Sequence, residues 1–222
     1  YYTASMMTTA PFLYGAQPNM GLYFQPDGPH ENPAELLPRG KIKAAREVQE
    51  AAAQQLRQDL VFVGKKLNTI GCEGLNFDTG GSAGDADFWA ALQAVRDLKK
   101  AAPNLPIIMG GSGEFVLGMH GEVEFDGQQL AGMYPHEQAK MAKSAGASIY
   151  GVAIGTKTTE SVAWNIARAA TFVKEAVTAV NIPVHVNVGM GVGGVPMMEA
   201  PPIDSVTRAS KSLVQIGKAD GL

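Results

Sequence analysis

Cysteine is almost absent from this chain, since Cys72 is the single one among 222 residues. A disulfide framework is therefore excluded, and we expect a reducing cytoplasm as the compartment. Basic residues are also few, because 18 Lys and Arg stand against 21 Asp and Glu, which gives a net charge of −3. They form no cluster of the kind that contacts a nucleic-acid backbone, so we expect no nucleic-acid partner. No run of about 18 apolar residues occurs, and we expect no membrane-spanning helix.

Histidine is scarce too, and its spacing excludes the common metal-binding patterns. The four histidines are His30, His120, His136 and His185. No two of them stand one helical turn apart, as in H-x-x-x-H, and Cys72 has no neighbouring ligand. We therefore expect no bound metal.

The residues that are present in number have the balance of a globular protein, with 45% hydrophobic and 18% charged residues. Short apolar runs alternate with longer stretches in which apolar residues recur every three or four positions, as they do in amphipathic helices. The runs predict strands near residues 11–15, 74–77, 106–109, 147–152 and 182–187. The longer stretches predict helices near residues 41–69, 86–101, 137–144, 161–179 and 203–216.

This alternation indicates an α/β fold in which helices cover a parallel sheet. Two architectures satisfy the pattern, a doubly wound sheet and a (β/α) barrel. A closed barrel of this type has eight strands, so the predicted strands would form only part of one. Residues 217–222 resemble the lead-in to a further strand.

Polar side chains follow the predicted strands at their carboxyl ends, where functional groups of such folds gather. Asp85 is interpreted as a cap of the next helix, because Asp is strongly preferred there. Asp78 and Glu114 are candidates for function, since carboxylates at strand ends can act as general acid or base. The groups expected to converge on one rim of a parallel sheet are Asp78, Asp85, Asp87, Glu114, His120, Glu122, Lys157 and Asn187.

The fifth predicted strand and the loop after it carry two further features. His185 alternates with apolar neighbours, so it faces either the interior of the fold or the helix layer. Gly189, Gly191 and Gly194 have the spacing G-x-G-x-x-G of dinucleotide-binding loops. The next helix begins only after residues 201–202, which disfavours that function. A turn that brings backbone close to another ligand and a plain tight turn both remain open.

Several longer motifs resemble the dimethylamine methyltransferases. They are GAQPNMGLY at 15–23, NFDT at 76–79, EFVLGMHG at 114–121, SVAWNIARA at 161–169, NIPVHVN at 181–187 with the glycine loop up to residue 194, and PPIDSVTRASK at 201–211. The motifs span essentially the whole chain and are not shared by generic barrels.

The resemblance implies a partial (β/α)8 TIM barrel with about five of eight βα units, so that residues 1–222 form a single, incomplete methyltransferase domain. It implies transfer of a methyl group from dimethylamine to the cobalt of a cognate corrinoid protein, leaving monomethylamine, as in methylamine-dependent methanogenesis. No cofactor would be bound directly, because the methyl acceptor is the partner's corrinoid. Glu114 and Asp78 would hold or deprotonate the amine, and Asn187, His185 and Lys157 would bind substrate.

In this family a pyrrolysine, whose imine-bearing ring binds the amine, follows an end like Asp220-Gly221-Leu222. We therefore expect a partial chain that stops just before the pyrrolysine, lacks the family's N-terminal portion and is inactive alone. The full-length protein is expected to be a homo-oligomer. Two alternatives stay open: a phosphate- or nucleotide-binding barrel enzyme that uses the loop 189–194, and a non-catalytic module that binds a corrinoid protein.

Overall fold

The computed structural model describes residues 17–222, so the strand predicted at 11–15 lies outside the described residues. The chain forms two compact units. Of the described residues, the first takes in 17–75 together with 83–105 and 117–131, and the second consists of 76–82, 106–116 and 132–222. Each described helix within these residues is too short or too polar to cross a lipid bilayer.

The first unit is built on two helices that pack along each other. They are α3 (Ile42–Thr69) and α4 (Asp85–Ala101). A methyl group added to Gly64 of α3 would lie 2.7 Å from a Leu98 methyl of α4, so the two backbones approach closely there. The smaller elements are the 3₁₀ turns η1 (Met20–Tyr23) and η2 (Leu37–Arg39), the short helix α2 (Pro33–Leu36), and the hairpin strands β3 (Glu124–Phe125) and β4 (Gln128–Gln129).

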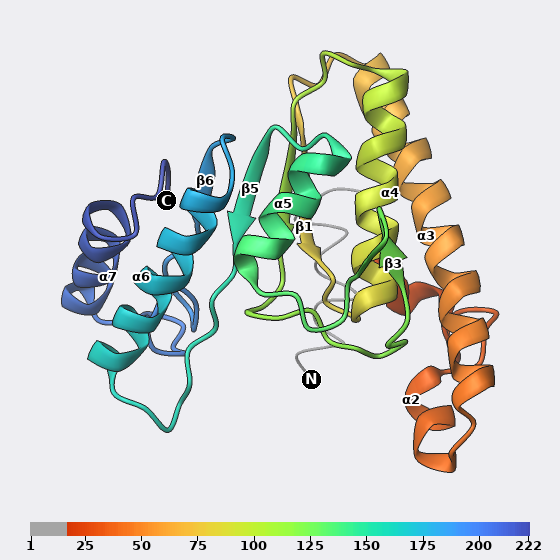
Figure 1. Cartoon of the computed structure of the whole chain (residues 1–222), viewed down its shortest axis with the longest axis horizontal. Helices are drawn as coiled ribbons and strands as arrows, with labels where there is room; N and C mark the ends of the chain where they lie inside the picture. The colour runs from red at the N-terminus through yellow and green to blue at the C-terminus, as the bar shows by residue number, and fades with distance from the viewer. Residues whose placement is uncertain (1–16) are drawn as a thin grey trace. The chain divides into compact units, whose positions relative to one another are not determined.

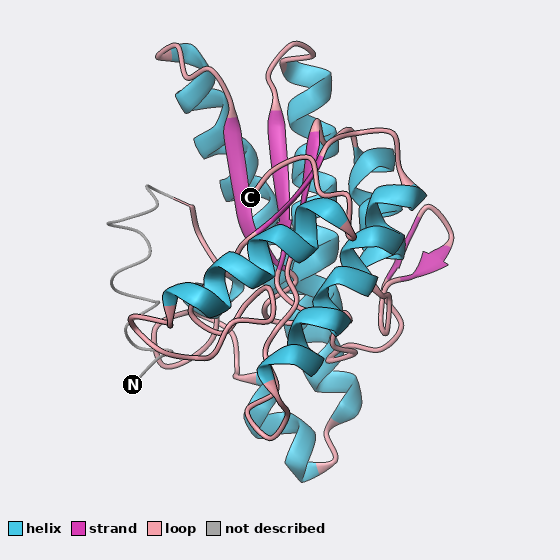
Figure 2. Ribbon diagram, turned by 90° about the vertical axis from the view of Figure 1, so that its left-hand side faces the viewer, coloured by secondary structure: helices cyan, strands magenta, loops and turns pink. Residues whose placement is uncertain are grey.

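The second unit contains a four-stranded sheet of order β1-β2-β5-β6. Its strands are β1 (Leu75–Gly80, of which Asn76–Gly80 belong to this unit), β2 (Ile107–Gly111), β5 (Ile149–Val152) and β6 (Val184–Val186). The pairings of β2 with β5 and of β5 with β6 are parallel. Its helices are α5 (Pro135–Ala145), α6 (Val162–Ala179) and α7 (Ile203–Gln215). Figure 1 labels these elements along the chain, and Figure 2 shows the strands of the sheet in magenta.

Helix α5 covers one face of this sheet, where a buried polar contact joins it to β5. The Tyr150 hydroxyl donates a hydrogen bond of 2.9 Å to Gln138 Oε1. Gln138 Nε2 donates in turn to the carbonyls of Met133 (2.9 Å) and Gly113 (3.2 Å). Burial raises the pKa of the Tyr150 phenol, so this group stays protonated and acts as a donor. Gln138 thus ties the helix to the sheet and to the loop that leaves β2.

The prediction of an α/β fold with a parallel sheet and intervening helices is confirmed, and the boundaries of the five long helices agree within two residues. The expectation for residues 217–222 also has support, because Gly221 forms a parallel bridge with His185 and Asp220 N–H donates to the Val184 carbonyl. Two regions without a predicted helix or strand contain short elements that the sequence did not predict. Residues 17–39 contain α2 and two 3₁₀ turns, and residues 110–134 contain the β3–β4 hairpin.

Replacement of Gln138 by Leu is expected to destabilise the protein by about 2–4 kcal/mol, because a buried hydroxyl and two carbonyls lose their partner. Tyr150→Phe removes only one of these hydrogen bonds and should cost about 1–2 kcal/mol. Urea denaturation followed by circular dichroism measures both values. Equal losses for the two variants would contradict the anchoring role of Gln138.

Candidate functional site

One face of the sheet in the second unit carries a row of aligned positions. The register pairs Gly110 of β2 with Gly151 of β5, and Gly151 with His185 of β6. Residues in register on neighbouring parallel strands direct their side chains to the same face. The face covered by α5 is the other one, since a Cβ on the adjacent Gly111 would lie 2.8 Å from the Tyr150 hydroxyl.

Asp78 and His185 lie at the two ends of this row and reach over its glycines. A Cβ added to Gly110 would lie 3.2 Å from Asp78 Oδ1. A Cβ added to Gly151 would lie 2.7 Å from His185 Nε2 and 3.2 Å from the Gly110 Cα. The two glycines therefore form a backbone floor, and we call it the glycine floor. The sequence left open whether His185 faces the interior of the fold or the helix layer. In the structure His185 lies on the face opposite to the helix α5.

The His185 imidazole is poorly solvated in this position. Its Nε2 is buried and has no hydrogen-bond partner among residues 17–222. Burial lowers the pKa of His185, while the negative charge of Asp78 acts in the opposite direction and is the smaller effect. The ring is therefore neutral at pH 7. A buried nitrogen without a partner is uncommon in native proteins, so this atom is a candidate for ligand binding.

Glu114 is held by a cation in the same unit. It forms an ion pair with Arg168 of α6, and the side chains are only 17% and 12% exposed. The guanidinium also donates to the Gly155 carbonyl at 3.1 Å and lies 5.4 Å from the ring centroids of both Trp164 and Phe172. Glu114 is accordingly a fixed carboxylate whose charge is balanced by Arg168.

Lys157 and Asn187 are more exposed than the carboxylates. The Lys157 ammonium lies 5.3 Å from the Trp164 ring centroid. The buried Asn165 fixes the Lys157 backbone, since its Oδ1 accepts from Lys157 N–H at 2.9 Å and its Nδ2 donates to the Lys157 carbonyl at 3.1 Å. Asn187 is exposed directly after β6. A Cβ on Gly193 would lie 2.6 Å from its carbonyl oxygen, so the glycine loop folds back onto this residue.

The glycine loop after Asn187 uses its own backbone amides. The N–H groups of Gly189, Gly191 and Gly193 donate to the carbonyls of Val192, Pro196 and Ile154. A Cβ on Gly194 would lie 2.6 Å from the Ile166 Cα of α6. The glycines are therefore required by close packing and by left-handed backbone, whereas a phosphate cradle needs free N–H groups.

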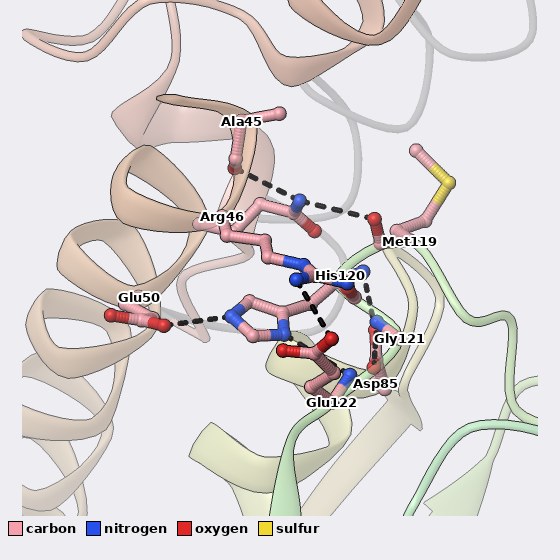
Figure 3. A network of polar contacts seen from close by, with 9 residues as sticks. Ala45, Arg46, Glu50, Asp85, Met119, His120, Gly121 and Glu122 are labelled. Carbon is pink, nitrogen blue, oxygen red and sulfur yellow. Dashed lines mark hydrogen bonds and ion pairs between the residues drawn. The ribbon is translucent and has the colours of Figure 1, made fainter. Parts of the chain in front are cut away.

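Four further groups from the predicted rim belong to the first unit: Asp85, Asp87, His120 and Glu122. Asp87 accepts from the Ala83 N–H at 3.1 Å, and the other three form a network of their own (Figure 3). Asp85 is the first residue of α4, and its carboxylate accepts from the N–H groups of His120 (2.9 Å) and Gly121 (2.7 Å). It therefore anchors a loop, whereas the sequence predicted a helix cap. His120 Nε2 contacts Glu50 Oε1 at 2.8 Å, and Arg46 pairs with Glu122 at 2.8 Å.

Sequence reasoning did not single out Arg168, Gly110 or Gly151. Glycine inside a predicted strand often marks a close approach of another group, and this signal was present at Gly151, whereas Gly110 lies just after the strand predicted at 106–109. Arg168 has no comparable local signal, because it meets Glu114 only through the tertiary fold. Among the described residues, no cluster of three or more His, Cys, Asp or Glu side chains has the arrangement of a metal site.

Comparison with known proteins gives one family. The dimethylamine methyltransferase family matches residues 2–222 of this chain. No solved structure matches the chain.

Glu114→Gln should lower the free energy of unfolding by about 3 kcal/mol, because a largely buried guanidinium loses its counter-charge. The matched control is Glu122→Gln, whose carboxylate is 66% exposed beside Arg46 and should contribute less than about 1 kcal/mol. The double variant Glu114→Gln, Arg168→Met should recover much of the loss. Thermal and urea denaturation measure these values, and an additive double variant would argue against the pair.

Proposed function

This chain belongs to the dimethylamine methyltransferase family, and we propose that it transfers a methyl group from dimethylamine to the cobalt of a cognate corrinoid protein, releasing monomethylamine. The family match over residues 2–222 is the observation that carries the proposal. The chain itself binds no cofactor in this scheme, since the methyl acceptor is the corrinoid of the partner. We place this reaction in the cytoplasm and in a homo-oligomer of the complete protein.

We further propose that residues 1–222 form one domain of (β/α)8 barrel type. The parallel strands β2, β5 and β6 support it, as does the alternation with α5, α6 and α7. The face opposite to α5 would then be the barrel interior, where enzymes of this architecture place their functional groups at the carboxyl ends of the strands. Asp78 and His185 are two ionisable groups at that face in the second unit.

The chemistry requires activation of the amine, because a secondary ammonium is a poor methyl donor and no ordinary side chain offers an electrophilic imine. We propose that pyrrolysine follows Leu222 and supplies that imine. The backbone of residues 220–221 runs beside β6, with Gly221 bridged to His185. Because side chains alternate along an extended chain, a residue two positions after Gly221 would face the same side as His185, which supports this placement.

The two alternative functions have different standing. Nucleotide or phosphate binding at the glycine loop is disfavoured, because the amides of Gly189, Gly191 and Gly193 already donate within the protein. A non-catalytic module that binds a corrinoid protein would use the same partner, so only a measurement of methyl transfer separates it from the enzyme.

The complete protein, produced with pyrrolysine decoding, should methylate a Co(I) corrinoid protein in the presence of dimethylamine. Asp78→Asn and Glu114→Gln should each lower the rate about 10²-fold, as expected for loss of an acid–base or charge-stabilising group. Asp204→Asn is the control, because its carboxylate is 64% exposed on α7. Absorbance of the methyl-cobalt product follows the reaction, and binding of the corrinoid protein without turnover would establish the non-catalytic alternative.

Peptide mass spectrometry of the protein from its natural host tests the pyrrolysine proposal separately. The peptide that contains Asp220-Gly221-Leu222 should continue with a residue of pyrrolysine mass. Any of the twenty ordinary amino acids at that position would contradict the proposal.

A further inference from the structure

Six large apolar side chains of the second unit are exposed at one edge of its sheet. The strands β2, β5 and β6 are parallel, so their carboxyl ends lie at the same edge. Two of the six belong to the segment between β2 and α5, one to the first turn of α6, and three to the loop between β6 and α7. They are Phe115, Tyr134, Trp164, Met190, Met197 and Met198, each between 40% and 65% exposed, and we call them the edge patch.

Principle contacts between loops hold the methionine side of the edge patch together. A Cβ added to Gly191 would lie 2.5 Å from the Met197 methyl carbon, so this side chain folds back beside Met190. The Thr156 N–H, in the segment that leaves β5, donates to the Gly191 carbonyl at 2.7 Å. The same segment leads into α6, where Trp164 stands in the first turn. The methionines and the tryptophan therefore belong to neighbouring segments.

The aromatic side of the edge patch is continuous through α6. The Tyr134 ring stacks on Phe172 with the ring centroids 6.0 Å apart. The Arg168 guanidinium lies 5.4 Å from the ring centroids of both Phe172 and Trp164. Phe115 directly follows the carboxylate that pairs with Arg168. The three exposed aromatic residues thus gather around one buried cation.

Met190 stands on a strained backbone at the centre of the glycine loop. Its φ is 48°, between Gly189 with φ 141° and Gly191 with φ 85°. A positive φ is uncommon for a residue with a side chain, whereas glycine adopts it readily. The Met190 side chain is 62% exposed, so packing does little to offset the strain. A strained position that presents an apolar side chain to solvent indicates a role in binding.

The size of the edge patch is that of a protein–protein contact. A large side chain of this kind has roughly 200 Å² of surface, and the six residues are each 40–65% exposed. The patch therefore presents roughly 600 Å² of mainly apolar surface, against about 300–600 Å² for the largest apolar patch of a typical monomer. One side of a standard interface buries about 800 Å², so the patch accounts for most of one.

We infer that the edge patch is the surface on which the corrinoid protein docks. The inference rests on the proposed function and adds the contact surface to it. Methyl transfer forms a cobalt–carbon bond, so the cobalt must come within bonding distance of the amine. In the proposed barrel the amine is held at the carboxyl ends of the strands, and the partner must cover this edge to reach it. Methionine and aromatic side chains are enriched in protein interfaces, and flexible methionines adapt to a partner's surface.

A second copy of this chain is a poorer occupant of the same edge. A permanent subunit contact there would close the side from which the amine enters, whereas a methyl acceptor binds, reacts and leaves. Lys157, Glu160 and Glu199 are exposed beside the edge patch and give it a charged border. An apolar centre with a polar, solvent-accessible border is the usual form of a contact between proteins that also exist apart.

The test uses the complete protein, produced with pyrrolysine decoding, and its cognate corrinoid protein. Calorimetry gives the Kd of docking, and initial rates give kcat and the KM of each substrate. Met190→Asn removes an exposed apolar side chain and introduces a residue that tolerates the left-handed backbone. It should raise the Kd and the KM for the corrinoid protein about tenfold, as loss of an interface anchor does. The kcat, the KM for dimethylamine and the melting temperature should not fall.

Val214→Gln is the matched control, because it makes the same change of polarity at a side chain that is 45% exposed. It lies in the last turn of α7, roughly 15 Å along the helix axis from the first turn. This variant should dock like the wild type. An equal loss of affinity in Val214→Gln and Met190→Asn would overturn the inference, since the effect would not be specific to the edge patch.

An unaltered Kd in Met190→Asn, or absence of docking by the wild type, would also overturn it. Light scattering tests the second copy, because a lower molecular mass of Met190→Asn with unchanged docking would make the patch a subunit contact. Failure of the proposed function gives a different result. Docking that Met190→Asn weakens, without methyl transfer, would remove the reaction and leave the surface. Methyl transfer with an unaltered KM for the corrinoid protein in Met190→Asn would remove the surface alone.

Discussion

The parallel register of β2, β5 and β6 is the constraint on which the candidate site depends. It aligns Gly110, Gly151 and His185 across three strands, so that the imidazole extends over Gly151 while the Asp78 carboxylate lies over Gly110. A shift of one residue in the pairing of β5 with β6 would turn His185 toward the helix layer, because side chains alternate along a strand. The same register places Tyr150 against Gln138 on the opposite face, where buried hydrogen bonds hold α5 to the sheet. The packing of one face therefore fixes the geometry of the other.

Charge in the second unit is arranged in two different ways. Glu114 is neutralised by Arg168, whose guanidinium lies 5.4 Å from the centroids of two aromatic rings, so this carboxylate is suited to fixing a geometry. Asp78 instead acts on an imidazole that burial keeps neutral. Asp78 on β1 and Glu114 after the neighbouring strand β2 thus have environments that favour different roles.

The helices and the parallel sheet could be predicted because their apolar periodicity is local, as the agreement at α3, α4 and α6 shows. The candidate residues Asp78 and Glu114 could be named from their place after strands. Their partners could not, because the contacts of Arg168 with Glu114 and of His185 with Gly151 join segments far apart in the chain. The glycine loop shows that a local motif can also mislead. Its spacing matches a nucleotide-binding motif, but tertiary packing against Ile166 explains its glycines.

The central claim is that the complete protein handles dimethylamine on the face of this sheet opposite to α5, where Asp78 and His185 lie. A crystal structure of the complete protein soaked with dimethylammonium chloride tests it most directly. The account predicts that the ligand binds beside the Asp78 carboxylate, on the face opposite to α5. A ligand bound elsewhere, such as in the groove between α6 and α7 lined by Ala167, Lys174 and Arg208, would contradict it.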